Sequence, residues 1–403
     1  MKRFLFIICL AAASILSAGN DIDLAGISSF AYQLQDLNLA AAGASSFDLV
    51  IMDYSADGDD QTAYSAEQVE ALQFSGGSRK IVLCYISIGE AEDYRFYWQS
   101  KWAKNAPEWL DGENPDWKGN YRVKYWFDDW QTIIDHYLDR VLAAHFDGVY
   151  LDLIDSYEAY LSLSSVQASL EMVRFVRRIR EYGQIVDPDF LIFVQNGAEL
   201  ATIHSEYLDF LDGIGQEDLY YGYDEDGQET PSYITEQLEN YLQRFYEAGK
   251  IVLTVDYPFS NSEDRPYYDN DTSVKIRNAY LKSRQQGFIP YCTVRNLNYL
   301  TINPGFEPSG CLSPETGIFS LDQNYPNPFN QSTLISFQIF DSGCVRARIF
   351  DNSGREAAEL VHRIFNAGRH YIRWQPVDQP SGVYYCQIET DRFIAVKKMI
   401  LLK

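Results

Sequence analysis

Acidic residues recur in this sequence at one kind of position. Asp53, Asp152, Glu217 and Asp256 each follow a short, largely apolar run, and Glu90 comes shortly after another. Cleavage of a glycosidic bond needs one carboxylic acid to protonate the leaving oxygen and one carboxylate to attack the anomeric carbon or activate water. If the chain brings these acids together, they can perform that reaction.

We predict Asp152 and Glu217 as the catalytic pair, because both would end parallel strands and face one another across a common site. Asp155 lies further along the loop and stays open as the alternative catalyst. The other polar residues near strand ends are predicted to bind substrate: Asp53, Tyr85, Glu90, Asp155, Asn196, Asp256, Tyr291 and Arg295.

The two carboxyl groups should differ in protonation. As the acid, Glu217 should have a pKa raised by its neighbour, while Asp152 stays ionised. We predict that the two carboxyl groups lie roughly 5–6 Å apart, the retaining separation, rather than the roughly 6.5–9.5 Å that leaves room for an inverting water.

Other chemistries have less support in the sequence. The His residues are scattered without HxH or HExxH spacing, and no Cys pair has CxxC spacing, so we expect no metal and no cofactor. This disfavours Ser-His-Asp hydrolysis and a metal-dependent deacetylase. The sparse Cys residues are no disulfide framework, and the pairing of Cys344 with Cys386 is left open.

The candidate residues must be positioned by a repeating pattern of strands and amphipathic helices that occupies residues 20–303. Gly249 and Gly287 each separate a helix from the next strand, as the left-handed turn there requires. Eight strands are predicted: Ser28–Gln33, Asp48–Asp53, Lys80–Ile86, Gly148–Asp152, Phe190–Gln195, Gly213–Gln216, Lys250–Val255 and Gly287–Tyr291. Eight is the count of an α/β (β/α)₈ TIM barrel, whose active site lies where strands end. The first and last units offer only short helices, so we expect irregular closure.

The segment from Glu92 to Tyr125 is much longer than a usual loop. Six Trp residues lie in it or just after it: Trp98, Trp102, Trp109, Trp117, Trp126 and Trp130. Two interpretations are open. The rings anchor the segment by burial, or one or two of them stack on sugar rings at the barrel mouth.

The chain ends indicate where the protein works. Residues 1–19 have the basic start, apolar run and small residues of a secretory signal peptide, and no later stretch is apolar enough for a transmembrane anchor. The formal net charge of −24 would repel nucleic acid. A cationic polymer would be attracted, although an acidic surface also simply solubilises an exported protein.

A second domain follows the barrel. Residues 304–316 have the Pro, Gly and Ser content of a linker, and residues 317–403 predict a small all-β sandwich. Its expected strands are Thr333–Phe340, Val345–Phe350, His370–Trp374 and Gly382–Glu389.

Six blocks occur in order along the barrel region: Phe30–Gln35, Val50–Ser55, Tyr85–Glu92, Phe146–Asp155, Gln195–Gly197 and Gly215–Asp218. Through them this region resembles glycoside hydrolase family 114, whose characterised members are endo-α-1,4-polygalactosaminidases. The resemblance implies Asp152 as nucleophile, Glu217 as acid/base, and an α-1,4-linked galactosamine polymer as substrate.

The last domain resembles the sorting domain of type IX secretion cargo. The motifs are Asn324–Asn330, Ala367-Gly368, Ser381–Tyr385 and Lys397–Lys403. This resemblance implies an immunoglobulin-like sandwich, the type IX secretion machinery as a partner, and a secreted or cell-surface location.

Two functions thus remain in view. The leading hypothesis is a secreted, endo-acting, retaining glycoside hydrolase that uses two carboxylates. The alternative is a non-catalytic glycan-binding or adhesion protein on the same barrel, which would have no need for both Asp152 and Glu217.

Overall fold

The computed structural model describes residues 22, 24–75, 79–163, 167–260, 266, 268–303, 320–339, 343–352, 354–366, 368–376, 379–390 and 394–402. The predicted signal peptide (1–19) and linker (304–316) lie outside these residues.

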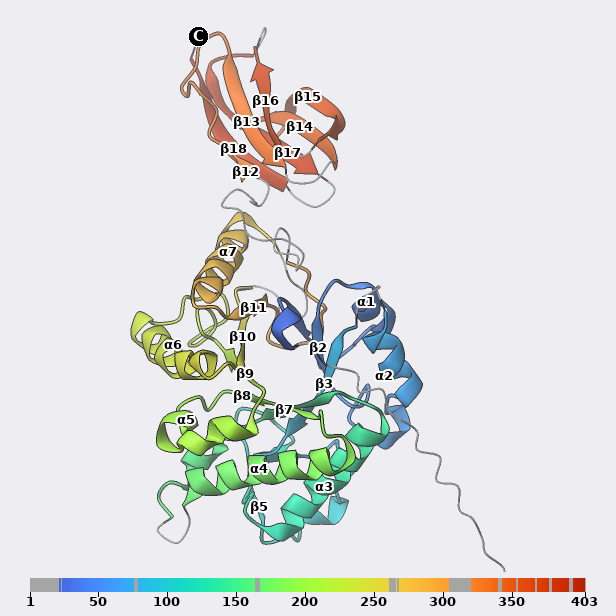
Figure 1. Cartoon of the computed structure of the whole chain (residues 1–403). Coiled ribbons are helices and arrows are strands. Elements are labelled where there is room, and N and C mark those ends of the chain that lie inside the picture. Colours follow the sequence, from blue (N-terminus) through green and yellow to red (C-terminus); the bar gives the residue numbers. More distant parts are fainter. Residues whose placement is uncertain are drawn as a thin grey trace, which may run out of the picture.

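Eight parallel strands form one sheet in chain order (Figure 1). They are β1 (Phe30–Tyr32), β2 (Leu49–Met52), β3 (Ile81–Ser87), β7 (Gly148–Asp152), β8 (Leu191–Gln195), β9 (Gly213–Glu217), β10 (Ile251–Asp256) and β11 (Ile289–Cys292). All eight predicted strands are confirmed, with ends within two residues of the predicted ones.

The sheet curls into a nearly closed barrel. Between β1 and β11 no ladder forms among the described residues. Instead, the backbone N–H groups of Leu34 and Gln35 both donate to the Leu297 carbonyl, and the Phe30 and Tyr291 rings lie 5.4 Å apart. The predicted irregular closure is confirmed, because side-chain packing and two loop hydrogen bonds stand where a ladder between β1 and β11 would close a regular barrel.

Strand alternation sorts side chains between two cores. On β10, Leu253 and Val255 belong to the cluster inside the barrel, while Val252 packs in the larger cluster under the helices. On β8, Phe193 is inside and Val194 outside. A side chain at the end of a strand therefore faces the barrel interior only if it shares the parity of the inner residues.

Helices cover the outside of the barrel (Figure 1). The α-helices of the barrel region are α1 (Leu39–Ala44), α2 (Ala66–Gln73), α3 (Asp128–Ala143), α4 (Ala168–Val186), α5 (Leu200–Ile203), α6 (Ser232–Glu247) and α7 (Asn270–Gln285). Short 3₁₀ segments lie at Leu24–Gly26, Asp60–Thr62, Ser100–Ala103, Ile154–Tyr160 and Ser205–Phe210. Gly249 and Gly287, just after α6 and α7, have φ of 73° and 82°, the left-handed turn expected there. None of the described helices is long and apolar enough to cross a membrane.

The long segment after β3 forms a small antiparallel sheet in the order β4 (Glu90–Glu92), β6 (Asn120–Val123), β5 (Leu110–Glu113). Its Trp residues mostly serve as anchors. Trp102, Trp109 and Trp130 are buried and form a chain of contacts with ring centroids 5.1 Å apart at each step. These three rings are therefore unavailable for sugar stacking, whereas Trp117 is 57% exposed.

The C-terminal domain consists of two antiparallel sheets. One has the order β12 (Ser320–Leu321), β13 (Thr333–Ile339), β16 (Gly368–Trp374), and the other β15 (Glu356–Phe365), β14 (Gly343–Asp351), β17 (Gly382–Thr390), β18 (Ile394–Leu401). The sequence-based expectation missed β12, β15 and β18. Cys344 lies opposite Ile364 and Cys386 opposite Ile349, so neither Cys is paired.

Candidate active site

Asp152 and Glu217 end β7 and β9, the two strands on either side of β8. The parity of both residues directs their side chains toward the barrel interior at its carboxyl-terminal end. Asp152 accepts hydrogen bonds from the Tyr85 hydroxyl and from the backbone N–H of Leu153, both at 2.6 Å. The structure therefore brings together two predicted catalytic residues and Tyr85, a predicted substrate contact.

The electrostatics of the pair differ from the sequence-based expectation. Burial, followed by the negative charge of Glu217, raises the pKa of Asp152 to about 8. We expected Asp152 to stay ionised, and its raised pKa contradicts that expectation for the free protein. The physical reason is that burial removes water from the Asp152 carboxyl group, and the nearby Glu217 charge disfavours a second negative charge there.

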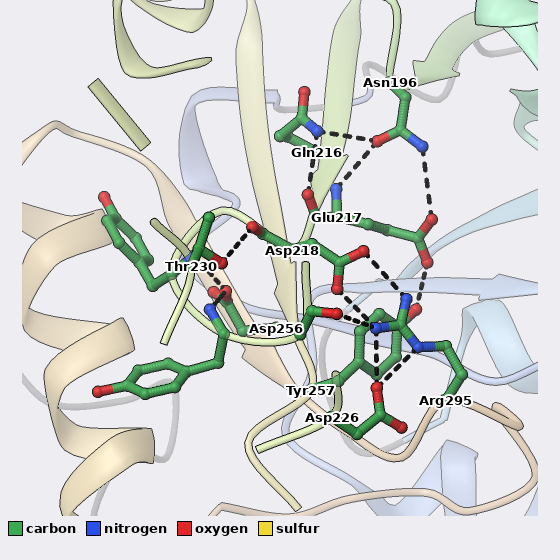
Figure 2. Close-up of polar contacts among 12 residues, drawn as sticks. Asn196, Gln216, Glu217, Asp218, Asp226, Thr230, Asp256, Tyr257 and Arg295 are labelled. Atoms are coloured by element: carbon green, nitrogen blue, oxygen red, sulfur yellow. Dashed lines mark hydrogen bonds and ion pairs between the residues drawn. The ribbon is translucent and has the colours of Figure 1, made fainter. Parts of the chain in front are cut away.

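Three residues donate hydrogen bonds to the Glu217 carboxylate; Gln195 and Tyr257 are absent from the predicted set, whereas Asn196 was predicted as a substrate contact. The Gln195 amide donates to Glu217 Oε2 at 2.5 Å. The Tyr257 hydroxyl donates to Oε1, and the Asn196 amide lies 3.5 Å from Oε2 (Figure 2). The Tyr32 hydroxyl donates to Gln195 Oε1 at 2.8 Å. Since this contact occupies the amide oxygen, the Gln195 NH₂ group faces Glu217.

The alternation of side chains along β10 would have predicted that Tyr257 faces the site. It lies two residues beyond Val255, which faces the barrel interior, whereas Asp256 has the opposite parity. Asp256 is fully buried, and its Oδ1 accepts hydrogen bonds from the backbone N–H groups of Tyr220 and Tyr221 at 2.6 and 2.8 Å. Asp256 thus holds the loop after β9, in place of the substrate contact that we predicted.

The backbone turns sharply after each of three neighbouring strands. Leu153, Asn196 and Asp218 directly follow β7, β8 and β9, and their φ angles are 61°, 59° and 57°. Non-glycine residues rarely adopt this conformation, and each such residue costs on the order of 1–3 kcal/mol. The turn at Leu153 aims its N–H at Asp152, and the Asn196 Oδ1 accepts from the Glu217 N–H at 3.1 Å. The strained turns thus position Asp152 through its carboxylate and Glu217 through its backbone.

Asp53 takes part in a buried ion network. The Arg95 guanidinium, 1% exposed, pairs with Asp53 at 2.7 Å and with Glu92 at 2.5 Å. Breaking such a buried pair leaves an uncompensated charge and costs about 3–5 kcal/mol. Asp53 therefore fastens the segment after β3 to β2, and its contacts are not those of the substrate-binding residue that we predicted.

Tyr291 is also committed to the interior. It is fully buried, packs against Phe30 and Phe47, and its hydroxyl accepts from the Thr301 N–H at 3.0 Å. We predicted a substrate contact here, but the residue fills the barrel core near the β1–β11 closure.

Glu90 and Asp155 lie beside the pair on the β3 and β7 side. Glu90 is buried and its Oε1 accepts from Asn114 at 2.9 Å. Burial, followed by the Glu158 and Glu199 carboxylates, raises the pKa of Asp155 to about 6. These residues add negative potential near the site, and Asp155 keeps its predicted place one step beyond Asp152.

The remaining predicted site residue, Arg295, follows β11. Its guanidinium donates to Asp218, Asp226 and the Gly222 carbonyl at 2.8–3.0 Å (Figure 2). Nε, Nη1 and Nη2 each donate to an acceptor within the protein, in place of the substrate contact that we predicted. As for metals, the described residues contain no group of three His, Cys, Asp or Glu side chains arranged to hold an ion.

Asp152→Asn should stabilise the protein increasingly as pH rises. Between the ordinary Asp pKa near 4 and the folded value of about 8, the unfolded chain binds fewer protons, so wild-type stability falls with rising pH. Asn cannot ionise and escapes this loss. We expect a gain of at least about 1 kcal/mol between about pH 5 and 8, measured by urea denaturation.

The control for this experiment is Glu236→Gln on the exposed face of α6. Its stability difference from wild type should stay the same across that pH range. A constant difference for Asp152→Asn as well would show that Asp152 ionises normally in the folded protein.

Comparison with known proteins identifies both regions of the chain. The profile of glycoside-hydrolase family GH114 matches residues 12–305, and that of a secretion system C-terminal sorting domain matches residues 323–402. The sorting domain indicates export by type IX secretion, so the protein is secreted or attached to the cell surface.

Relatives and solved structures extend the match. An uncharacterized protein of Thermotoga maritima is 34% identical over 77% of this chain and 96% of its own length, and one of Methanocaldococcus jannaschii is 38% identical over 65% and 74%. The glycoside hydrolase domain of PelA from Pseudomonas aeruginosa aligns with a TM-score of 0.53 at 15% identity, covering 69% of this chain and 98% of that domain. Aspergillus fumigatus Ega3, solved in complex with galactosamine, aligns with a TM-score of 0.51 at 16% identity over 67% and 92%.

The two structural matches share the barrel fold, and the family profile matches more than half of the chain. This protein therefore belongs to glycoside-hydrolase family GH114.

Proposed function

We propose that this glycoside hydrolase cleaves α-1,4-linked galactosamine polymers from within the chain, with retention of configuration. The observation that carries the proposal is the placement of Asp152 and Glu217 at the ends of β7 and β9, close enough for the charge of one to raise the pKa of the other. A glycan-binding protein has no need of this costly pair.

In the proposed mechanism the pair holds one proton when substrate arrives. In the free protein Asp152 can hold this proton below about pH 8, because burial and the Glu217 charge raise the pKa of Asp152 to about 8. For hydrolysis it must move to Glu217, which protonates the leaving oxygen while the freed Asp152 carboxylate attacks the anomeric carbon. Water then hydrolyses the glycosyl-enzyme bond, with Glu217 acting as base. Above about pH 8 the pair loses its proton, and the rate should fall.

A cationic sugar fits this scheme. An ammonium group close to the pair stabilises an ionised Asp152 and so promotes transfer of the proton. Further negative charge lies nearby on Asp155 and Glu199, and the whole chain has a formal charge of −24. These charges favour a substrate with free amines over a neutral glycan.

The test is to incubate the purified protein with de-N-acetylated galactosaminan, its fully N-acetylated form, and a neutral α-1,4-glucan. We expect oligosaccharides of several lengths from the first polymer, detected by mass spectrometry, with the α anomer appearing first in ¹H NMR spectra. Asp152→Asn serves as the matched inactive control. Binding of all three polymers without cleavage would instead support the adhesion alternative.

A further inference from the structure

A cluster around Arg295 joins the ends of three strands next to Glu217. Arg295 follows β11, Tyr257 follows β10, and Asp218 and Asp226 lie in the loop after β9. The guanidinium forms two parallel hydrogen bonds with Asp218, at 2.8 and 3.0 Å, and reaches Asp226 Oδ1 at 2.8 Å. A planar fork held by two carboxylates has little freedom to move.

The face of this guanidinium lies on the Tyr257 ring, with the Cζ atom 3.8 Å from the ring centroid. Tyr257 is 1% exposed, and its hydroxyl donates to Glu217 Oε1 (Figure 2). The contacts therefore form a continuous path from the two aspartates through Arg295 and Tyr257 to Glu217. A positive charge over the ring also makes the phenol a stronger donor, since it stabilises negative charge on the phenol oxygen.

Gly222 makes room for this arrangement. Its φ is 118°, and a Cβ atom there would collide with Asp218 Oδ1 and crowd the Arg295 Nη2 atom at 2.8 Å. Its loop is held by the two backbone hydrogen bonds to Asp256. The cluster therefore has two supports. Gly222 leaves space for it by having no side chain, and the buried Asp256 carboxylate fixes the backbone of the loop.

We propose that Arg295 is a positioning residue that acts through Tyr257: it holds the Tyr257 hydroxyl on Glu217 and thereby sets the orientation and proton affinity of that carboxylate. The inference rests on the proposed function for its kinetic consequences, but its electrostatic consequence does not need turnover. The titratable groups that interact electrostatically with Glu217 are Asp152, Asp218 and the hydroxyls of Tyr32, Tyr150 and Tyr257, whereas Arg295 reaches Glu217 through Asp218 and Tyr257.

The test is a double-mutant cycle between Arg295→Lys and Tyr257→Phe. Tyr257→Phe removes one hydrogen bond to a charged group, so kcat should fall about tenfold to a hundredfold with little change in KM. Arg295→Lys keeps the charge but loses the fork and the stacking, and kcat should fall about tenfold. In the Tyr257→Phe background, Arg295→Lys should change kcat less than about twofold, because its target is already gone.

The matched control is Arg180→Lys. Arg180 forms a similarly exposed ion pair with Asp212 at 3.0 Å, just before β9 and so at the opposite end of the barrel. This variant should have wild-type kcat and a wild-type pH profile. Equal losses from Arg295→Lys in both backgrounds, or no loss in the wild-type background, would overturn the proposal.

A second measurement does not depend on hydrolysis. The protonation midpoint of the pair can be followed by NMR of ¹³C-labelled carboxyl groups, with Asp152→Asn and Glu217→Gln used for assignment. Loss of a donor to Glu217 disfavours its ionised form, so the midpoint should move to higher pH in Tyr257→Phe and in Arg295→Lys, but not in Arg180→Lys. If no glycan is cleaved, the proposed function fails and this shift still supports the role of Arg295; an unmoved midpoint overturns it.

Discussion

Asp152→Asn and Glu217→Gln should each slow hydrolysis of the polymer by at least about a thousandfold, in proteins that remain folded. Loss of a positioned acid or base costs about 10²–10⁴ in rate, and loss of a nucleophile removes the covalent step altogether. Both substitutions preserve shape, and Asn or Gln can still accept the hydrogen bonds from Tyr85 or Tyr257. Released reducing ends measure the rate, and circular dichroism verifies the fold.

Asp155→Asn is the informative comparison for this pair. Asp155 lies in the same acidic surroundings and has a raised pKa of about 6, but it is one step beyond the strand end. Its loss should reduce the rate by less than about tenfold. A thousandfold loss from Asp155→Asn together with near-normal turnover by Asp152→Asn would transfer the nucleophile assignment to Asp155.

Azide can separate the roles of the two carboxylates. With an activated aryl α-glycoside, a variant without its nucleophile lets azide attack directly and gives the β-glycosyl azide. A variant without its acid/base still forms the glycosyl-enzyme, and azide then gives the α product. We therefore expect the β-azide from Asp152→Gly and the α-azide from Glu217→Ala; exchanged products would reverse the two roles.

Ending the chain after Pro308 should abolish export while hydrolysis continues. The two core clusters of the barrel consist of residues from Ile27 to Leu297, and the core of the last domain runs from Leu321 to Leu401. Neither core draws residues from the other, so each can form without the other. Activity in lysate and in the culture medium or on the cell surface is the measurement.

The reciprocal chain provides the control for that experiment. A fluorescent protein that folds in the periplasm and is fused to residues 317–403 should be exported, whereas the truncated enzyme should not. A folded truncated enzyme without activity, or one still found outside the cell, would show that the division between the two domains is wrong.

The alternation of side chains along a strand is what made the site predictable. Asp152 and Glu217 share the parity of Tyr150 and Gly215, so their inward direction follows from the period of two in any strand. The same rule applied to β10 selects Tyr257 over Asp256. Our error at Asp256 was therefore an error of parity, which the sequence could have corrected.

The roles of some other residues could not be predicted from local sequence patterns. Asp53 has the inward parity of Ile51 and looks like a site residue, but Arg95 lies on a segment whose course no local pattern specifies. The Trp residues posed the same problem: only the packing of Trp102 on Trp109, and of Trp109 on Trp130, shows that these rings are buried.

By itself, the sequence determined the eight strands, the antiparallel sheets that follow them and the strand-end positions of Asp152 and Glu217, because hydrophobic periodicity and strand-end position are local properties. Only the tertiary structure decided which polar side chains are used up in internal contacts. Arg295 illustrates the reason: its free energy of interaction depends on Asp218, Asp226 and Tyr257, which lie far apart in the chain and meet only where β9, β10 and β11 end side by side. The protonation of Asp152 has the same origin, since desolvation and the nearby Glu217 charge exist only once the barrel has formed.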